Sequence, residues 1–176
     1  MDIRSATTLF DESDIDREIT DLAARLAPRL SGDWTIVSIL IGAMPFTTDL
    51  MKALSRLNVH PVLDALWLES YRDSRESSGR VVVRADLSRP VQNRGVLIVD
   101  DVYDTGRTLE FAKTHMEAKG AREVLTCALV RKPSAPDGGV DFFAIEAPDE
   151  FLVGYGMDVS GQYRGLPFIG AATDED

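Results

Sequence analysis

The sequence predicts an α/β fold in which a mostly parallel sheet is flanked by helices. Two continuous apolar runs, at 35–41 and 96–99, are typical of strands that are buried on both faces. Between these runs, apolar residues recur at helical spacing, as they do over 46–57. Strands that alternate with helices along a chain indicate parallel pairing, with ligands bound at the carboxyl ends of the strands.

Each element has its own local signal. The first helix is expected to begin at Ser13 or Asp14 and to end near Pro28, because apolar residues fall at helical spacing between them. Gly42 ends the first buried strand, and Gly120 ends a helix that we expect over 107–119. Further strands are expected at 61–68, 81–83, 124–130, 142–145 and 151–153.

Composition bounds the class of protein. The chain has 176 residues, which fits one domain of ordinary size. Its 29 acidic and 19 basic side chains give a net charge of −10, which repels phosphate backbones and argues against nucleic acid as a partner. No apolar run reaches the roughly 18 residues that span a bilayer, so we expect no membrane insertion. The single cysteine, Cys127, cannot form an internal disulfide, which fits the reducing cytoplasm.

A dense group of polar side chains comes directly after the strand at 96–99, where the next helix starts. A helix N-terminus offers N–H groups and a partial positive charge, and a glycine there lets a phosphate approach the backbone closely. Carboxylates beside such a cradle hold sugar hydroxyls or magnesium, or take a proton. The alternative is an acidic turn in which Asp104 or Thr105 only caps the helix. The candidate residues are Asp100, Asp101, Asp104, Thr105, Gly106 and Thr108.

These residues carry a resemblance to a known family. The segment VLIVDDVYDTGRTL, residues 96–109, is similar to the signature by which type I phosphoribosyltransferases bind 5-phosphoribosyl 1-diphosphate (PRPP). The resemblance covers about residues 8–170 and implies the type I phosphoribosyltransferase fold, with a small hood formed by terminal segments. Other segments resemble the hypoxanthine-guanine branch: SILIGAMPFTTDLMKAL, LESYRDSRESSG, ALVRKPS and VDFFAIEAPDEFLVGYGMDVSGQYRGLPFIG.

The resemblance assigns the polar residues after 96–99 to the ribose phosphate. Asp100 and Asp101 match an acidic pair that contacts the ribose hydroxyls, directly or through magnesium. Asp104 matches the residue that exchanges a proton with a nitrogen of the purine's five-membered ring, and it is the implied catalytic residue. The implied phosphate-binding residues are Thr105, Gly106, Arg107 and Thr108.

The resemblance also implies a base pocket and a diphosphate pocket. Lys132 matches a lysine that donates to the exocyclic oxygen of the purine, and an ammonium selects an oxo group because it is only a donor. Phe151 matches an aromatic ring that stacks on the base, and Leu152 matches a position whose backbone carbonyl faces it. Asp158 matches a magnesium ligand beside the base, and Arg164 matches an arginine that meets the diphosphate. The implied magnesium ligands are Asp100, Asp101 and Asp158.

Ordinary structural roles remain the alternatives for these residues. Phe151 would then pack in the core, and Lys132 and Arg164 would be solvated surface residues. Arg131, directly before Lys132, is a second cation that could face the base instead.

Two segments depart from the family's usual pattern. The loop after the first strand commonly reads Leu-Lys-Gly, whereas here Ile41 precedes Gly42 and the lysine is missing. These two residues match the diphosphate-binding loop, and the bond before Ile41 matches one that is often cis in the family. The second departure is in the mobile catalytic loop. This loop keeps Ser70 and Tyr71, which match residues that cover the diphosphate. The residues on either side of this pair differ from the usual pattern.

The resemblance implies a magnesium-dependent transfer of the 5-phosphoribosyl group from PRPP to hypoxanthine or guanine, giving IMP or GMP and diphosphate in purine salvage. The implied assembly is a homodimer or homotetramer in the cytoplasm. One alternative is a regulatory module that senses PRPP or a nucleotide, which the missing lysine at Ile41 favours. Another is a transferase that acts on xanthine or another base. The retained Lys132, Phe151 and Tyr71 favour an enzyme.

Overall fold

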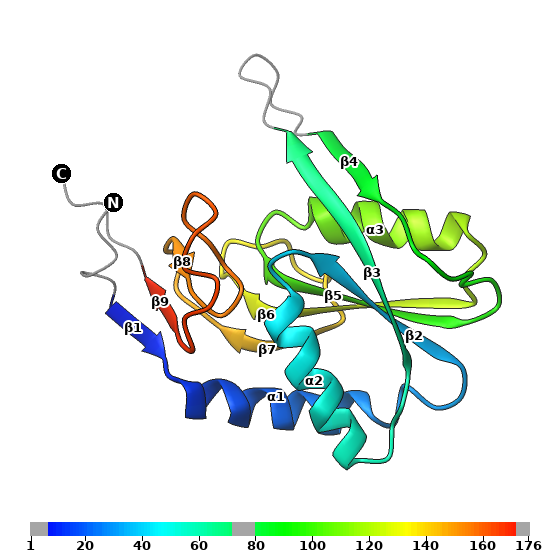
Figure 1. Ribbon diagram of the computed structural model, residues 1–176, viewed down its shortest axis with the longest axis horizontal. Coiled ribbons are helices and arrows are strands. Elements are labelled where there is room, and N and C mark those ends of the chain that lie inside the picture. Colours follow the sequence, from blue (N-terminus) through cyan, green and yellow to red (C-terminus); the bar gives the residue numbers. More distant parts are fainter. Residues whose placement is uncertain (1–6, 72–79, 172–176) are drawn as a thin grey trace.

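The computed structural model describes residues 7–71 and 80–171, with side chains over 7–69 and 81–171. Its centre is a six-stranded sheet with strand order β4-β3-β2-β5-β6-β7 (Figure 1). Every neighbouring pair is parallel except β3 and β4, which confirms the predicted mostly parallel sheet. The strands are β2 (Trp34–Leu40), β3 (Val62–Tyr71), β4 (Arg80–Ala85), β5 (Gly95–Tyr103), β6 (Glu123–Arg131) and β7 (Phe142–Glu146).

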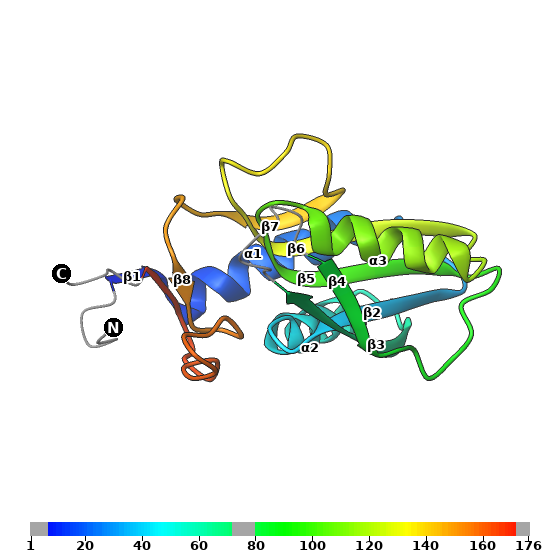
Figure 2. The same ribbon diagram turned by 90° about the horizontal axis from the view of Figure 1, so that it is seen from above.

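Helices cover both faces of this sheet. The helices α1 (Glu12–Leu26) and α2 (Met44–Arg56) pack on one face, and α3 (Arg107–Ala118) packs on the other. Figure 2 shows α2 and α3 on opposite sides of the strands. No helix in the two described segments is long and apolar enough to cross a bilayer.

Strand β5 shows why an apolar run without alternation predicted a buried strand. Its side chains alternate between two core clusters: Leu97 and Val99 pack with α1 and α2, whereas Val96 and Ile98 pack with α3. Cys127, on the neighbouring strand, is completely buried. Burial raises the pKa of its thiol, which keeps this cysteine protonated and makes it a packing residue.

A smaller antiparallel sheet with strand order β1-β9-β8 stands at one end of the molecule (Figure 1). It consists of β1 (Thr7–Phe10), β8 (Leu152–Val153) and β9 (Ile169–Ala171). This sheet and the segment between β8 and β9 form the predicted hood. Strands β1 and β9 were not predicted, because neither carries a continuous apolar run: β1 begins with two threonines, and β9 has a glycine at its centre.

The first helix begins earlier than the sequence indicated. Its N-cap is Asp11, not Ser13 or Asp14. The carboxylate of Asp11 accepts from the backbone N–H of Asp14 at 2.9 Å, and the Asp14 carboxylate accepts from the N–H of Asp11 at 3.3 Å. The predicted start is wrong because Asp11, Ser13 and Asp14 are all residue types that cap helices. With Asp11 as the N-cap, two backbone N–H groups are satisfied at once.

Strand β5 runs further than expected. The sequence predicts a loop at Asp100 and Asp101, whereas in the structure both lie in a strand that ends at Tyr103. The reason is that β6 continues beside them, with Asp100 opposite Ala128 and Tyr103 opposite Arg131. Both carboxylates are therefore carried by the sheet.

The connection after β4 is held to α3 by one carboxylate. Asp86 places Oδ2 at 2.7 Å from Nζ of Lys119 and Oδ1 at 3.1 Å from Nε2 of His115. Burial alone raises the pKa of Asp86. The bonds from Lys119, the Leu87 N–H and His115 outweigh it and lower the pKa from 3.8 to about 2.

Asp86→Asn is expected to lower the free energy of unfolding at neutral pH by less than about 1 kcal/mol, because the ion pair is partly exposed. A lowered carboxyl pKa contributes stability that is present above pH 3.8 and is lost as the pH falls towards 2. The difference in thermal unfolding between variant and wild type should therefore shrink over this range. A difference that does not change with pH would contradict this role.

Candidate active site

Two adjoining pockets lie where the strands β2, β5 and β6 end, on the side of the hood. The first, called the loop pocket, has a volume of about 470 Å³, and the second, called the carboxylate pocket, about 240 Å³. The loop pocket is lined by Asp100, Val102, Tyr103, Asp104, Thr105, Gly106, Thr108, Leu109, Lys132, Phe151, Leu152 and Met157. The carboxylate pocket is lined by Ile39, Leu40, Gly42, Leu68, Asp100, Asp101, Val102, Thr108, Asp158 and Arg164.

The way in which α3 begins makes the loop pocket suitable for an anion. The N-cap is Gly106, with a φ of 77°, and no side chain caps the helix. Neither Asp104 nor Thr105 is the N-cap, so the alternative in which they only cap the helix is wrong. The positive end of α3 lies at the loop pocket, which Gly106 and Thr108 line.

Asp100 and Asp101 are adjacent carboxylates whose negative charges are offset only weakly by cationic side chains. Burial raises the pKa of Asp100 well above its ordinary value, and the charge of Asp101 raises it further. Burial also raises the pKa of Asp101, although the Val102 N–H, the Asp100 side chain and the charge of Arg164 act in the opposite direction. A cation brought in by a ligand would relieve the unfavourable burial of two like charges.

These carboxylates fit a magnesium ion that is shared with a diphosphate. Within residues 7–71 and 80–171, no three side chains of histidine, cysteine, aspartate or glutamate gather into a metal site of their own. Protein-bound Mg²⁺ is usually held by one or two carboxylates together with phosphate oxygens and water. Asp100 and Asp101 therefore suit a metal that arrives with a phosphorylated substrate.

The turn after β2 brings Gly42 against Asp101. The Leu40–Ile41 peptide bond in this turn is cis. A Cβ on Gly42 would overlap Oδ2 of Asp101, so a larger residue here would have to displace that carboxylate. The Ile41 side chain is 46% exposed and lines neither pocket. The Ile41 side chain therefore supplies no contact to a ligand in either pocket.

Lys132 and its neighbour Arg131 have different surroundings. Lys132 lines the loop pocket, where its side chain is 16% exposed and its Nζ lies 3.7 Å from Oδ1 of Asp149. Arg131 instead forms ion pairs with Asp137 at 2.7 Å and Glu146 at 3.3 Å. Of the two cations, Lys132 is the one available to a ligand in the loop pocket.

Phe151 lines the loop pocket and is 53% exposed, whereas the adjacent Leu152 is buried. The alternative of core packing for Phe151 is therefore wrong. An exposed aromatic ring at the edge of a pocket is suited to stacking on a flat heterocycle.

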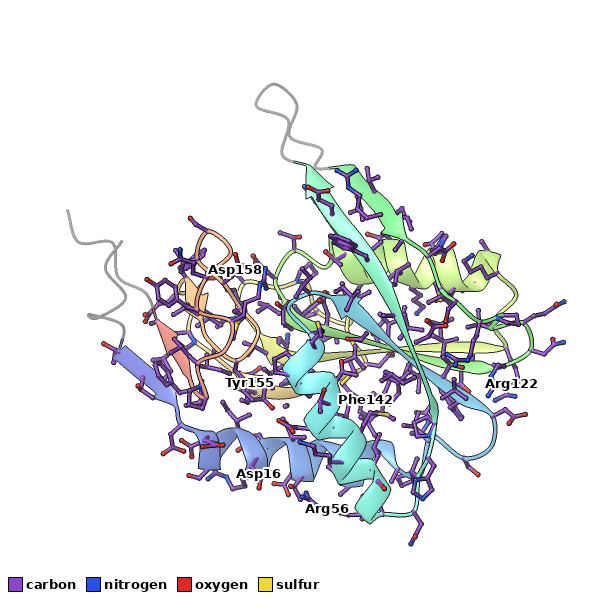
Figure 3. All side chains as sticks on the ribbon, in the orientation of Figure 1. Asp16, Arg56, Arg122, Phe142, Tyr155 and Asp158 are labelled. Atoms are coloured by element: carbon purple, nitrogen blue, oxygen red, sulfur yellow. The ribbon has the colours of Figure 1, made fainter. Side chains whose placement is uncertain are left out.

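Asp158 and Arg164 form the hood side of the carboxylate pocket. Figure 3 shows Asp158 on the segment between β8 and β9. Its Oδ1 lies 2.5 Å from Nη2 of Arg164, whose Nη1 donates to the carbonyl oxygen of Gly156 at 2.6 Å. A guanidinium held in this way can bind phosphate oxygens in a bidentate manner.

Not every predicted site residue falls in the two pockets. The side chain of Arg107 lines a separate hollow beside Phe111, so a contribution to phosphate binding would come from its backbone. The side chains of Ser70 and Tyr71 lie outside the described residues.

Tyr103 and Met157 also line the loop pocket, although the sequence did not predict them as site residues. Asp149, the partner of Lys132, was not predicted either. The available signal for Tyr103 was a large aromatic side chain directly before Asp104, at the end of an apolar strand.

Comparison with known proteins agrees with this geometry. The family model of the phosphoribosyl transferase domain matches residues 6–159, so the chain belongs to the phosphoribosyltransferase family. A hypoxanthine-guanine phosphoribosyltransferase from Bacillus subtilis is 33% identical over 165 residues, which are 92% of this chain and 90% of that protein. Within the family, the chain is therefore an enzyme of the hypoxanthine-guanine branch, which serves purine salvage.

Two further relatives extend the comparison. The chain is 34% identical over 170 residues to the bifunctional protein TilS/HprT of Listeria innocua, and it spans 26% of the length of that protein. The solved structure of hypoxanthine phosphoribosyltransferase from Trypanosoma cruzi, in complex with the product IMP, matches with a TM-score of 0.87 and 28% identity. The match covers 97% of this chain and 95% of that one.

Gly42→Ala is expected to lower kcat/KM for PRPP by about tenfold or more, because the added Cβ must displace the Asp101 carboxylate. Steady-state kinetics with varied PRPP measures the effect. Gly165→Ala is the matched control, since nothing lies within 4 Å of an ideal Cβ there, and it should retain wild-type kinetics. Equal values for both variants would show that the contact with Asp101 is unimportant.

Proposed function

We propose that the protein catalyses the magnesium-dependent transfer of the 5-phosphoribosyl group from PRPP to a 6-oxopurine, forming a nucleoside monophosphate and diphosphate. The bases are hypoxanthine and guanine, and the products are IMP and GMP. The loop pocket carries the proposal, because it joins Lys132 and Phe151 to Asp104 and the start of α3. It adjoins the carboxylate pocket through Asp100. The base, the ribose phosphate and the diphosphate would thus bind in contiguous parts of the two pockets.

The 5-phosphate binds at the start of α3. The hydroxyls of Thr105 and Thr108 donate to its oxygens, together with N–H groups of the first turn, among them that of Arg107. Gly106 leaves the backbone open to close approach.

The base binds between Phe151 and Lys132. The ammonium of Lys132 donates to the exocyclic oxygen, and this selects a 6-oxopurine over adenine, whose amino group is also a donor. The carbonyl of Leu152 accepts from N–H groups on the edge of the base. Phe151 stacks on the ring.

The reaction exchanges one bond at the anomeric carbon of the ribose. The bond to the diphosphate oxygen breaks with its electron pair, and a nitrogen of the purine's five-membered ring supplies the pair for the new bond. Asp104 takes the proton that this ring loses. Asp100 and Asp101 bind the ribose hydroxyls and complement the positive charge that develops on the sugar.

Arg164 and the backbone at Ile41 and Gly42 bind the departing diphosphate, with Ser70 and Tyr71 as a cover that excludes water. Asp100, Asp101 and Asp158 are the proposed magnesium ligands; they do not gather into one three-carboxylate site, so diphosphate oxygens and water would complete the coordination. When bound, magnesium neutralises negative charge on the diphosphate.

The proposed assembly is a homodimer or homotetramer. Its support is an uncovered apolar group at the start of α2 and on β3, where Ile41, Met44, Leu63 and Trp67 are each between 44% and 50% exposed. A second copy of the chain would remove these side chains from water.

The proposal is tested with purified protein, PRPP, magnesium and one base at a time: hypoxanthine, guanine, xanthine, adenine or uracil. Diphosphate release and nucleotide formation are both measured. We expect product with hypoxanthine and guanine and none with adenine or uracil. Product with adenine or uracil would overturn the base pocket, product with xanthine alone would favour the xanthine alternative, and no product at all would favour a sensing module.

Asp104→Asn is expected to lower kcat by about 10²- to 10⁴-fold, because the amide cannot take the proton. The dissociation constant for PRPP, measured by calorimetry, should change by less than about threefold, since the amide keeps the size of the side chain. Asp21→Asn, on the exposed face of α1, is the matched control and should have wild-type kinetics. An unchanged kcat in Asp104→Asn would exclude the proton-transfer role.

A further inference from the structure

Tyr103 takes no part in the proposed chemistry, yet it lies between the two sides of the loop pocket. It is the last residue of β5, directly precedes Asp104 and is only 2% exposed. Its ring packs against the N-cap of α3, because an ideal Cβ on Gly106 would lie 3.0 Å from Cε2 of Tyr103. The ring therefore supports the phosphate side of the pocket.

Two hydrogen bonds join Tyr103 to the segment that begins with Lys132. Its backbone carbonyl accepts from the N–H of Lys132 at 3.0 Å, and its hydroxyl donates to the carbonyl of Pro136 at 2.9 Å. Between them, the N–H of Ala135 donates to the carbonyl of Lys132 at 3.1 Å. Segment 132–136 is thus a closed turn that one tyrosine holds at both ends.

Gly139 completes the surroundings of the hydroxyl. An ideal Cβ on Gly139 would lie 1.8 Å from the hydroxyl oxygen of Tyr103 and 2.9 Å from Cζ. The backbone of Gly139 does not have a positive φ, so its conformation does not require glycine. A side chain at position 139 would therefore have to displace the tyrosine hydroxyl.

We propose that the hydroxyl of Tyr103 is a positioning group that sets Lys132 for the base. The inference rests on the proposed function, because it assumes that Lys132 binds the exocyclic oxygen. The ring supports Gly106, whereas the hydroxyl holds the turn that carries Lys132. Removal of the hydroxyl alone is therefore expected to weaken base binding and to leave phosphate binding intact.

Tyr103→Phe keeps the ring and removes the bond to Pro136. We expect KM for hypoxanthine and guanine to rise about three- to tenfold, because this is the change in affinity that the loss of one hydrogen bond typically causes. KM for PRPP should change by less than about twofold. Tyr155→Phe is the matched control, because the Tyr155 hydroxyl donates to Asp49 at 2.6 Å and neither residue lines either pocket. It should lower the melting temperature without changing either KM.

Gly139→Ala disturbs the same contact from the other side. It should raise KM for the base while Tyr103 is present, because the new methyl group pushes the hydroxyl and the turn apart. In the Tyr103→Phe background part of this clash is absent, so the double variant should be less impaired than the product of the two single effects.

The outcomes separate this inference from the proposed function. An active wild type whose base KM is unaffected by Tyr103→Phe would overturn the positioning role alone. Equal increases in both KM values, together with a lowered melting temperature, would assign Tyr103 a purely structural role and also overturn it. A wild type that is inactive with every base would overturn both.

Discussion

The parallel pairing of β5 with β6 is the constraint on which the site depends. The pairing continues beyond the apolar run, from Asp100 opposite Ala128 to Tyr103 opposite Arg131. Because both strands end at the same level, Asp104 and Lys132 follow them into one pocket. Side chains carried by paired strands keep their separation better than side chains on a free loop, which suits the precise placement that catalysis requires.

Much of this arrangement could be predicted from the sequence, because its signals are local. The unbroken apolar run before Asp100 indicated a strand with two buried faces, and the spacing from Asp104 to Thr108 indicated an anion site at a helix start. The end of β5 could not be predicted in this way. Aspartate is common in turns, and only the distant strand β6 keeps Asp100 extended. The contact of Tyr103 with Gly139 likewise joins segments that no local pattern relates.

The site gathers features that stable folds usually avoid. Asp100 and Asp101 are adjacent carboxylates whose pKa values are raised by burial, and Phe151 leaves a large apolar ring in contact with water. Each feature is unfavourable in the free protein and is matched by one part of the proposed substrates: a metal–diphosphate and a flat base. Because two parts of one reaction account for them, these local departures from stability support a common purpose.

The pairing of β1 with β9 has a consequence for folding. Thr7 lies opposite Ala171, so this pairing joins two segments that are far apart in the sequence and closes a long loop. The six strands of the central sheet end at Glu146 and pair with one another without β9. Asp158 and Arg164 lie between β8 and β9, and the hood that holds them closes only when β9 pairs with β1. The central sheet can therefore form with its two carboxylates before the guanidinium that faces them is in place, and the site is complete only when this long loop has closed.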